Sequence, residues 1–89
     1  MGKRGVQFAI ELVDQPERLA EVTDLMRDYG GRVGTVFSTR ERAEKGHRQA
    51  YIRLYDIDQP SLSRLKEVLN EKVRMRYIIN YQEKMSEIF

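Results

Sequence analysis

Cysteine and tryptophan are absent from the sequence, and histidine occurs only once, at His47. The absence of cysteine excludes disulfides, thiolate catalysis and cysteine-based metal sites, and it fits a cytoplasmic protein. No spacing around His47 supplies partner ligands, so we expect an exposed loop histidine and no metal site. No nucleophile is paired with a base and an orienting group, so we expect no catalytic residues, no cofactor and no enzyme activity.

Long apolar runs and a large surplus of one charge are also missing. No apolar segment approaches the roughly 18 residues that a membrane span requires. The 16 basic and 14 acidic residues leave a net charge of +2, so composition alone does not point to nucleic acid. Hydrophobic residues make up 40% of the 89 positions, which suits one small globular domain. We expect this domain at residues 6–81, with a leader or linker end at 1–5 and a tail at 82–89.

Hydrophobic periodicity predicts four strands in this domain. They are expected at 6–13, 33–39, 49–55 and 73–79, where apolar and polar residues alternate. The facing of 33–39 is ambiguous, because either alternate set contains a valine. On the last strand the alternation predicts one shared face for Met75, Tyr77 and Ile79. The tail from Gln82 is compatible with an extension of this strand or with a helix.

Two helices are predicted between the strands. The first should be capped by Asp14, with Pro16 in the first turn and Glu17 as a capping-box partner, and should end at Gly30-Gly31. The second should begin at the similar sequence Asp58-Gln59-Pro60 and close at Asn70. Their core-facing stripes contain Leu19, Val22, Leu25, Met26 and Tyr29 in the first helix and Leu62, Leu65, Val68 and Leu69 in the second.

The order β-α-β-β-α-β predicts an α+β fold, the ferredoxin-like βαββαβ sandwich. Right-handed crossovers in its two halves give a four-stranded antiparallel sheet with both helices on one face. The opposite face should be open and should present Tyr51, Arg53 and Tyr55. Such a face is compatible with a protein interface, with a plain strand surface or with nucleic-acid binding.

The segment Leu12 to Val22, followed by Tyr29 to Val33, resembles the ACT domain, a regulatory module that binds small ligands. The family pattern is a strand, Asp-x-Pro-Gly-x-Leu, a helix, Gly-(Gly/Ala)-Asn-(Ile/Val) and a second strand. The segment Thr35 to Arg40 also resembles the second strand of ACT domains that accompany CBS-domain pairs in acetoin-utilisation-type proteins. The residues that match the general pattern are Asp14, Pro16, Leu19, Gly30, Gly31 and Val33.

The resemblance implies a non-catalytic, allosteric protein that forms a homodimer through a sheet edge or helix contacts. It also implies that a small ligand such as an amino acid binds near the first strand–helix turn, between two copies. The bound ligand would favour one dimer geometry and so control an attached domain. The implied ligand-binding residues are Val13, Asp14, Gln15, Pro16, Glu17, Arg18, Leu19, Gly30, Gly31 and Val33.

Two departures from the family pattern keep other functions open. Glu17 stands where the family usually has glycine, and Arg32 stands where it often has asparagine. The Glu17 carboxylate itself suits the positive end of a helix, which favours a purely structural dimerisation module whose ligand site has been lost. A third alternative is nucleic-acid binding by the open face and the basic segment 40–48. Acidic Glu41 and Glu44 interrupt that segment, which favours a solvated hairpin over a phosphate-binding surface.

Overall fold

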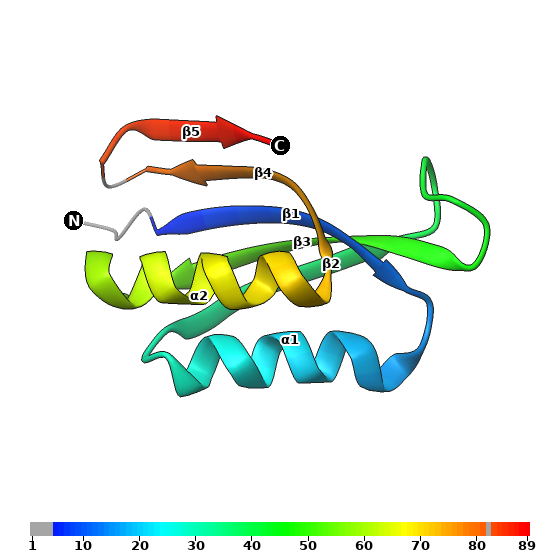
Figure 1. Cartoon of the computed structure of the whole chain (residues 1–89), viewed down its shortest axis with the longest axis horizontal. Coiled ribbons are helices and arrows are strands. Elements are labelled where there is room, and N and C mark those ends of the chain that lie inside the picture. Colours follow the sequence, from blue (N-terminus) through cyan, green and yellow to red (C-terminus); the bar gives the residue numbers. More distant parts are fainter. Residues whose placement is uncertain (1–4, 82) are drawn as a thin grey trace.

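A computed structural model of the chain describes residues 5–81 and 83–89. It is an α+β fold with two helices and a five-stranded sheet (Figure 1). The expected leader 1–5 lies outside the described residues except for Gly5, and so does Gln82 of the tail. The elements are β1 (Val6–Val13), α1 (Pro16–Asp28), β2 (Arg32–Thr39), β3 (His47–Tyr55), α2 (Gln59–Lys72), β4 (Arg74–Asn80) and β5 (Met85–Ile88).

The sheet has the strand order β2-β3-β1-β4-β5, and every neighbouring pair is antiparallel. The expectation of four strands is wrong, because part of the tail forms β5. This strand pairs with the outer edge of β4, from Asn80 opposite Met85 to Tyr77 opposite Ile88. An unpaired strand edge offers free N–H and C=O groups, so a tail that folds back satisfies them.

The core lies between one face of the sheet and the two helices, which lie together on that side (Figure 1). The alternation of β1 is confirmed, since Val6, Phe8, Ile10 and Leu12 all belong to the hydrophobic core. The helix stripes are confirmed as well: Val22 and Met26 of α1 are buried, and so are the three leucines of the α2 stripe. Neither helix in the described part of the chain has the length and apolar character needed to cross a bilayer.

A β-bulge explains why the sequence did not show which residues of β2 face the core. Val33 lies opposite Leu54, whereas Thr35 lies opposite Arg53, so Gly34 is the extra residue between them. The bulge exchanges the two faces, which explains why neither simple alternation fits the strand. Glycine suits this point, because a Cβ atom there would overlap the ring of Tyr55 unless that ring moved.

A second irregularity corrects the predicted facing of β4. Ala9 lies opposite Tyr77 and Ile10 opposite Met75, so Arg76 is the additional residue on β4. Met75 and Ile78 are therefore both buried on the core side, and Met75 does not share a face with Tyr77 and Ile79. A strict period of two is lost wherever one strand inserts a residue.

The two helices begin differently despite their similar sequences. Asp58 caps α2, since its carboxylate accepts a hydrogen bond of 2.8 Å from the Ser61 N–H. The predicted capping by Asp14 is wrong: α1 begins at Pro16 after Gln15, and no side chain among the described residues caps it. The Asp14 carboxylate is instead held by arginines. In the first turn of α1 the Arg18 N–H donates to the backbone carbonyl of Gln15 at 3.0 Å.

The helix ends are also only partly as expected. Gly30 has a φ of +93° and its N–H donates to the Arg27 carbonyl, which confirms the glycine end of α1. The predicted closure of α2 at Asn70 is wrong. The helix runs to Lys72, and Val73 then enters β4 with an extended φ of −137°. No left-handed residue is needed at such a direct exit from the helix.

Candidate functional site

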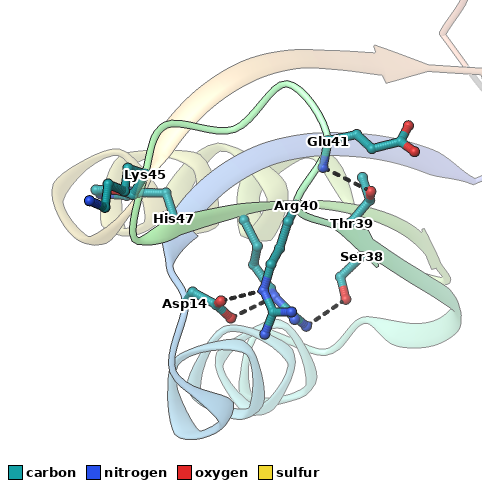
Figure 2. Close-up of polar contacts among 8 residues, drawn as sticks. Asp14, Ser38, Thr39, Arg40, Glu41, Lys45 and His47 are labelled. Carbon is teal, nitrogen blue, oxygen red and sulfur yellow. Dashed lines mark hydrogen bonds and ion pairs between the residues drawn. The ribbon is translucent and has the colours of Figure 1, made fainter.

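The turn between β1 and α1 is attached to the β2–β3 hairpin through Asp14. Its carboxylate oxygens lie 2.6 Å from Arg40 Nε and 2.9 Å from Arg48 Nε (Figure 2). Arg48 also donates through Nη1 to Ser38 Oγ at 3.0 Å. The backbone N–H of Asp14 donates to the Gly46 carbonyl at 2.9 Å. One carboxylate therefore connects the end of β1 to the end of β2 and the start of β3.

This arrangement keeps Asp14 ionised. The hydrogen bond from Arg40 is the main cause of a lowered pKa of Asp14, and desolvation opposes it. The positive charges of Arg40 and Arg48 lower this pKa further. At neutral pH the Asp14 charge is therefore matched by two guanidinium groups. Its role is to position the turn, and its side chain does not point freely toward a ligand.

The structure divides the expected ligand residues into two groups at opposite ends of α1. The first group surrounds the start of the helix, and all of its members except Asp14 and Leu19 are exposed. Gly30, Gly31 and Val33 follow the other end. A helix of 13 residues is about 20 Å long, so the two groups do not meet within one copy of the chain. The first group contains Val13, Asp14, Gln15, Pro16, Glu17, Arg18 and Leu19.

Gly31 has a packing role that the resemblance does not suggest. It is buried, and a Cβ atom added there would lie 2.6 Å from Leu54 Cδ1. Leu54 is itself fully buried in the core. The neighbouring Val33 is half-buried and packs against the same core. Gly31 therefore lets the end of α1 approach β3 closely.

A groove of about 290 Å³ lies where the first turns of α1 meet the end of α2. It contains Val13 and Arg18 from the predicted site, together with Glu21 and Lys72, which the sequence analysis missed. Glu21 is detectable in principle, because it lies one turn after Arg18 on the same helix face, with 3.5 Å between their charged atoms. Lys72 comes from the other helix and only the fold brings it here. The remaining lining residues are apolar: Leu12, Val22 and Val73.

This groove, which we call the α1–α2 groove, matches the charges of a free amino acid. Arg18 and Lys72 are suited to a carboxylate, Glu21 to an ammonium group, and the apolar residues to a side chain. Its volume is near the lower end of the range that small-molecule sites have.

The open face of the sheet carries Tyr51, Arg53 and Tyr55 as expected, because Ala50, Ile52 and Leu54 of the same strand face the core. Arg53 donates to Gln7 Oε1 at 2.9 Å and lies over the ring of Tyr81, while Arg32 covers Tyr55 at 5.0 Å. Arg53 and Tyr55 of the expected set are therefore in contact with neighbouring side chains on this face. Tyr51 instead packs against Phe37, with ring centroids 6.1 Å apart.

Tyr51 also lines a cavity of about 510 Å³ on the open face, together with three arginines. Two of these arginines have acidic partners: Arg74 lies 3.4 Å from Glu44, and Arg76 lies 3.8 Å from the buried Glu11. The positive charge of this cavity is thus partly neutralised, which weighs against a phosphate-binding surface. The three arginines are Arg42, Arg74 and Arg76.

His47 lies at the start of the third strand and is less exposed than the loop histidine that we expected. It is the first residue of β3, is half-buried, and approaches two carboxylates. One ligand atom from each of Glu11, Glu44 and His47 lies within 4.8 Å of the others. Among the described residues this is the group with a geometry that suits a metal ion.

No family model matches this sequence, and a comparison with curated proteins finds no match either. The likeness to ACT domains therefore depends on the residues of the strand–helix turn and on the order of the elements.

Proposed function

We propose that the protein is a non-catalytic regulatory domain of the ACT type, with a ferredoxin-like core extended by β5. The first four strands and two helices follow the order β-α-β-β-α-β, and their strand order within the sheet is β2-β3-β1-β4. This topology supports the ferredoxin-like assignment, with β5 as an addition at the β4 edge. The observation that carries the functional proposal is the α1–α2 groove, which lies beside the turn that resembles the family's ligand site.

The proposed ligand is a free amino acid. Its carboxylate would lie near Arg18 and Lys72, and its ammonium group near Glu21. The start of α1 supports the same orientation, because no described side chain caps it and the helix dipole favours an anion there. Glu17 is exposed beside this helix end and does not fill the groove.

The ligand site is tested by removing one of two matched arginines. Arg18 and Arg27 both lie on α1 and both form an exposed ion pair with an acid three residues away. Arg18→Ala is expected to lower amino-acid affinity about tenfold or more, because a charge-assisted contact is lost. Arg27→Ala should bind as the wild type does. Calorimetric titration measures both; equal affinities for the two variants would exclude the α1–α2 groove as the site.

The proposal also includes self-association through the β2 edge. In the described sheet β2 lies at one edge, and its Val36 and Phe37 are 41% and 60% exposed. An exposed apolar edge strand is a ready site for pairing with a second chain. Pairing would also explain how two groups of expected ligand residues that lie at opposite ends of α1 can form one site. A neighbouring copy is needed to bring Gly30 near another copy's Val13–Leu19 segment.

Sedimentation tests this association. The wild type is expected at twice 10.5 kDa, and Phe37→Asp at 10.5 kDa, because a carboxylate on the β2 edge opposes apolar contact. Ile88→Asp is the matched control at the opposite edge of the sheet, where Ile88 is 88% exposed, and it should remain a dimer. A wild type that stays at 10.5 kDa at high micromolar concentration would contradict the dimer. A dimer that binds no amino acid would support the alternative function, a purely structural dimerisation module.

A further inference from the structure

Glu11, Glu44 and His47 come together at the end of the sheet where β1 ends and β4 begins. Glu11 belongs to β1, Glu44 to the β2–β3 connection, and His47 to the start of β3. The strand register causes this meeting: His47 lies opposite Val13, two residues beyond Glu11 on the same strand face. Diagonal neighbours of this kind are within reach of long side chains.

The buried carboxylate of Glu11 is the first observation that indicates a cation. Glu11 is only 3% exposed. Its ion pair with Arg76 has a separation of 3.8 Å, which exceeds hydrogen-bond distance, and the described residues donate no hydrogen bond to it. The Glu11 carboxylate lines the same cavity as Glu44 and His47, so a cation bound there would contact it directly and pair with its charge.

The orientation of His47 is the second, independent observation. Its Nδ1 lies 3.3 Å from the Lys45 carbonyl oxygen, on the loop shown in Figure 2. A carbonyl only accepts hydrogen bonds, so this contact places the ring proton on Nδ1 and leaves the Nε2 lone pair free. Histidine ligands of metals are typically held in this way by a backbone carbonyl.

All three side chains line a cavity of about 300 Å³. We propose that this cluster is a binding site for a divalent transition-metal cation of the zinc type. One imidazole nitrogen and two carboxylate oxygens suit such a cation, and the cavity leaves room for water as a fourth ligand. Glu71 lines this cavity as well, so three carboxylates face Lys72 and Arg74 there and leave an excess of negative charge for the ion.

The arginines beside the cluster do not prevent binding. Arg74 pairs with Glu44 at 3.4 Å, but both side chains are more than 60% exposed, so this ion pair contributes little. A metal ion that takes Glu44 displaces a solvated guanidinium group, which returns to water. Arg76 is 44% exposed in its side chain and has the same route to solvent.

Zinc titration of the metal-free protein tests the site. Calorimetry is expected to show one Zn²⁺ per chain, and Zn²⁺ should raise the thermal unfolding midpoint because it binds only the folded arrangement. His47→Gln and Glu11→Gln should each lower the affinity at least about tenfold, since the loss of even an outer partner commonly has that effect. Glu41→Gln is the matched control. Glu41 lies in the same hairpin loop, and its carboxylate points away from His47 (Figure 2), so the Zn²⁺ affinity of this variant should equal that of the wild type.

Two NMR measurements allow the proposal to be tested even if a variant is unstable. Amide spectra show whether each variant keeps the wild-type fold, and the ring signals of His47 in the wild type show which nitrogen changes on addition of Zn²⁺. A selective change at Nε2 supports the site. The proposal is overturned if millimolar Zn²⁺ leaves the His47 signals unchanged, or if folded His47→Gln and Glu11→Gln variants bind Zn²⁺ as the wild type does.

Discussion

Replacing Gly31 with alanine is expected to destabilise the protein by about 1–3 kcal/mol, the usual result of overpacking a core. The added Cβ atom would lie 2.6 Å from Leu54 Cδ1 and 2.8 Å from its Cγ atom. Leu54 is fully buried, so it has little room to move away. Small domains have only about 5–15 kcal/mol of stability in total, so this loss is a large share. Urea unfolding measures it directly.

A double-mutant cycle separates this packing role from other causes. Leu54→Ala removes the three atoms that the new Cβ would meet, and alone it should cost about 2–5 kcal/mol. In that background Gly31→Ala should cost little, because the clash is gone and the cavity has space. If the two changes prove additive, the close approach of Gly31 to Leu54 is not what requires glycine at this position.

Acid is expected to destabilise the wild type more than an Asp14→Asn variant. The pKa of Asp14 is lowered below its ordinary value of 3.8, mainly by the hydrogen bond from Arg40. The stabilisation that this carboxylate provides is therefore fully present above pH 3.8 and is lost as the pH falls through the folded-state pKa. Asparagine lacks the charge at every pH. The variant should be less stable at neutral pH, and its stability should approach that of the wild type near about pH 2.

Unfolding free energies measured from pH 7 to pH 2 test this expectation. Asp58 also has a lowered pKa, through its hydrogen bonds from Ser61, so both proteins should retain some acid sensitivity. Asp24→Asn is the control, because its ion pair with Arg27 is exposed and local to α1. Its stability should follow the wild-type pH profile closely. A gap between Asp14→Asn and wild type that stays constant with pH would show that the Asp14 charge does not hold the hairpin.

Local patterns predicted most of the fold because they report burial directly. The alternation of β1 and the stripes of α1 and α2 come from residues that face one core, and the structure has them as expected. The bulges at Gly34 and Arg76 were not predictable in the same way, since an inserted residue breaks the period without leaving a pattern of its own.

The pair Asp14 and Asp58 shows where local reasoning fails. Both precede Gln-Pro at the start of a helix, yet only Asp58 is a cap. Asp14 forms ion pairs with Arg40 and Arg48, which are distant in the sequence. An ionised aspartate makes charge-assisted hydrogen bonds either as a helix cap or with arginines, and the tertiary fold decides which partners are within its reach.

The residues of the candidate sites were likewise predictable only where they are close in the sequence. Val13 and Arg18 were expected at the ligand site, and both line the α1–α2 groove. Lys72 comes from the far end of the other helix, and Glu11 approaches His47 only through the pairing of β1 with β3. Spacing along the chain cannot show such meetings, because they are set by strand register and helix packing.

The central claim, that an amino acid binds in the α1–α2 groove, is tested most directly by amide chemical shifts during titration with each of the twenty amino acids. The account predicts that at least one of them shifts the amides of Val13, Arg18, Val22 and Lys72, while residues at the far end of α1 respond only through a second copy. Unchanged groove amides at millimolar concentrations of every amino acid, in a protein that remains folded, would contradict the claim.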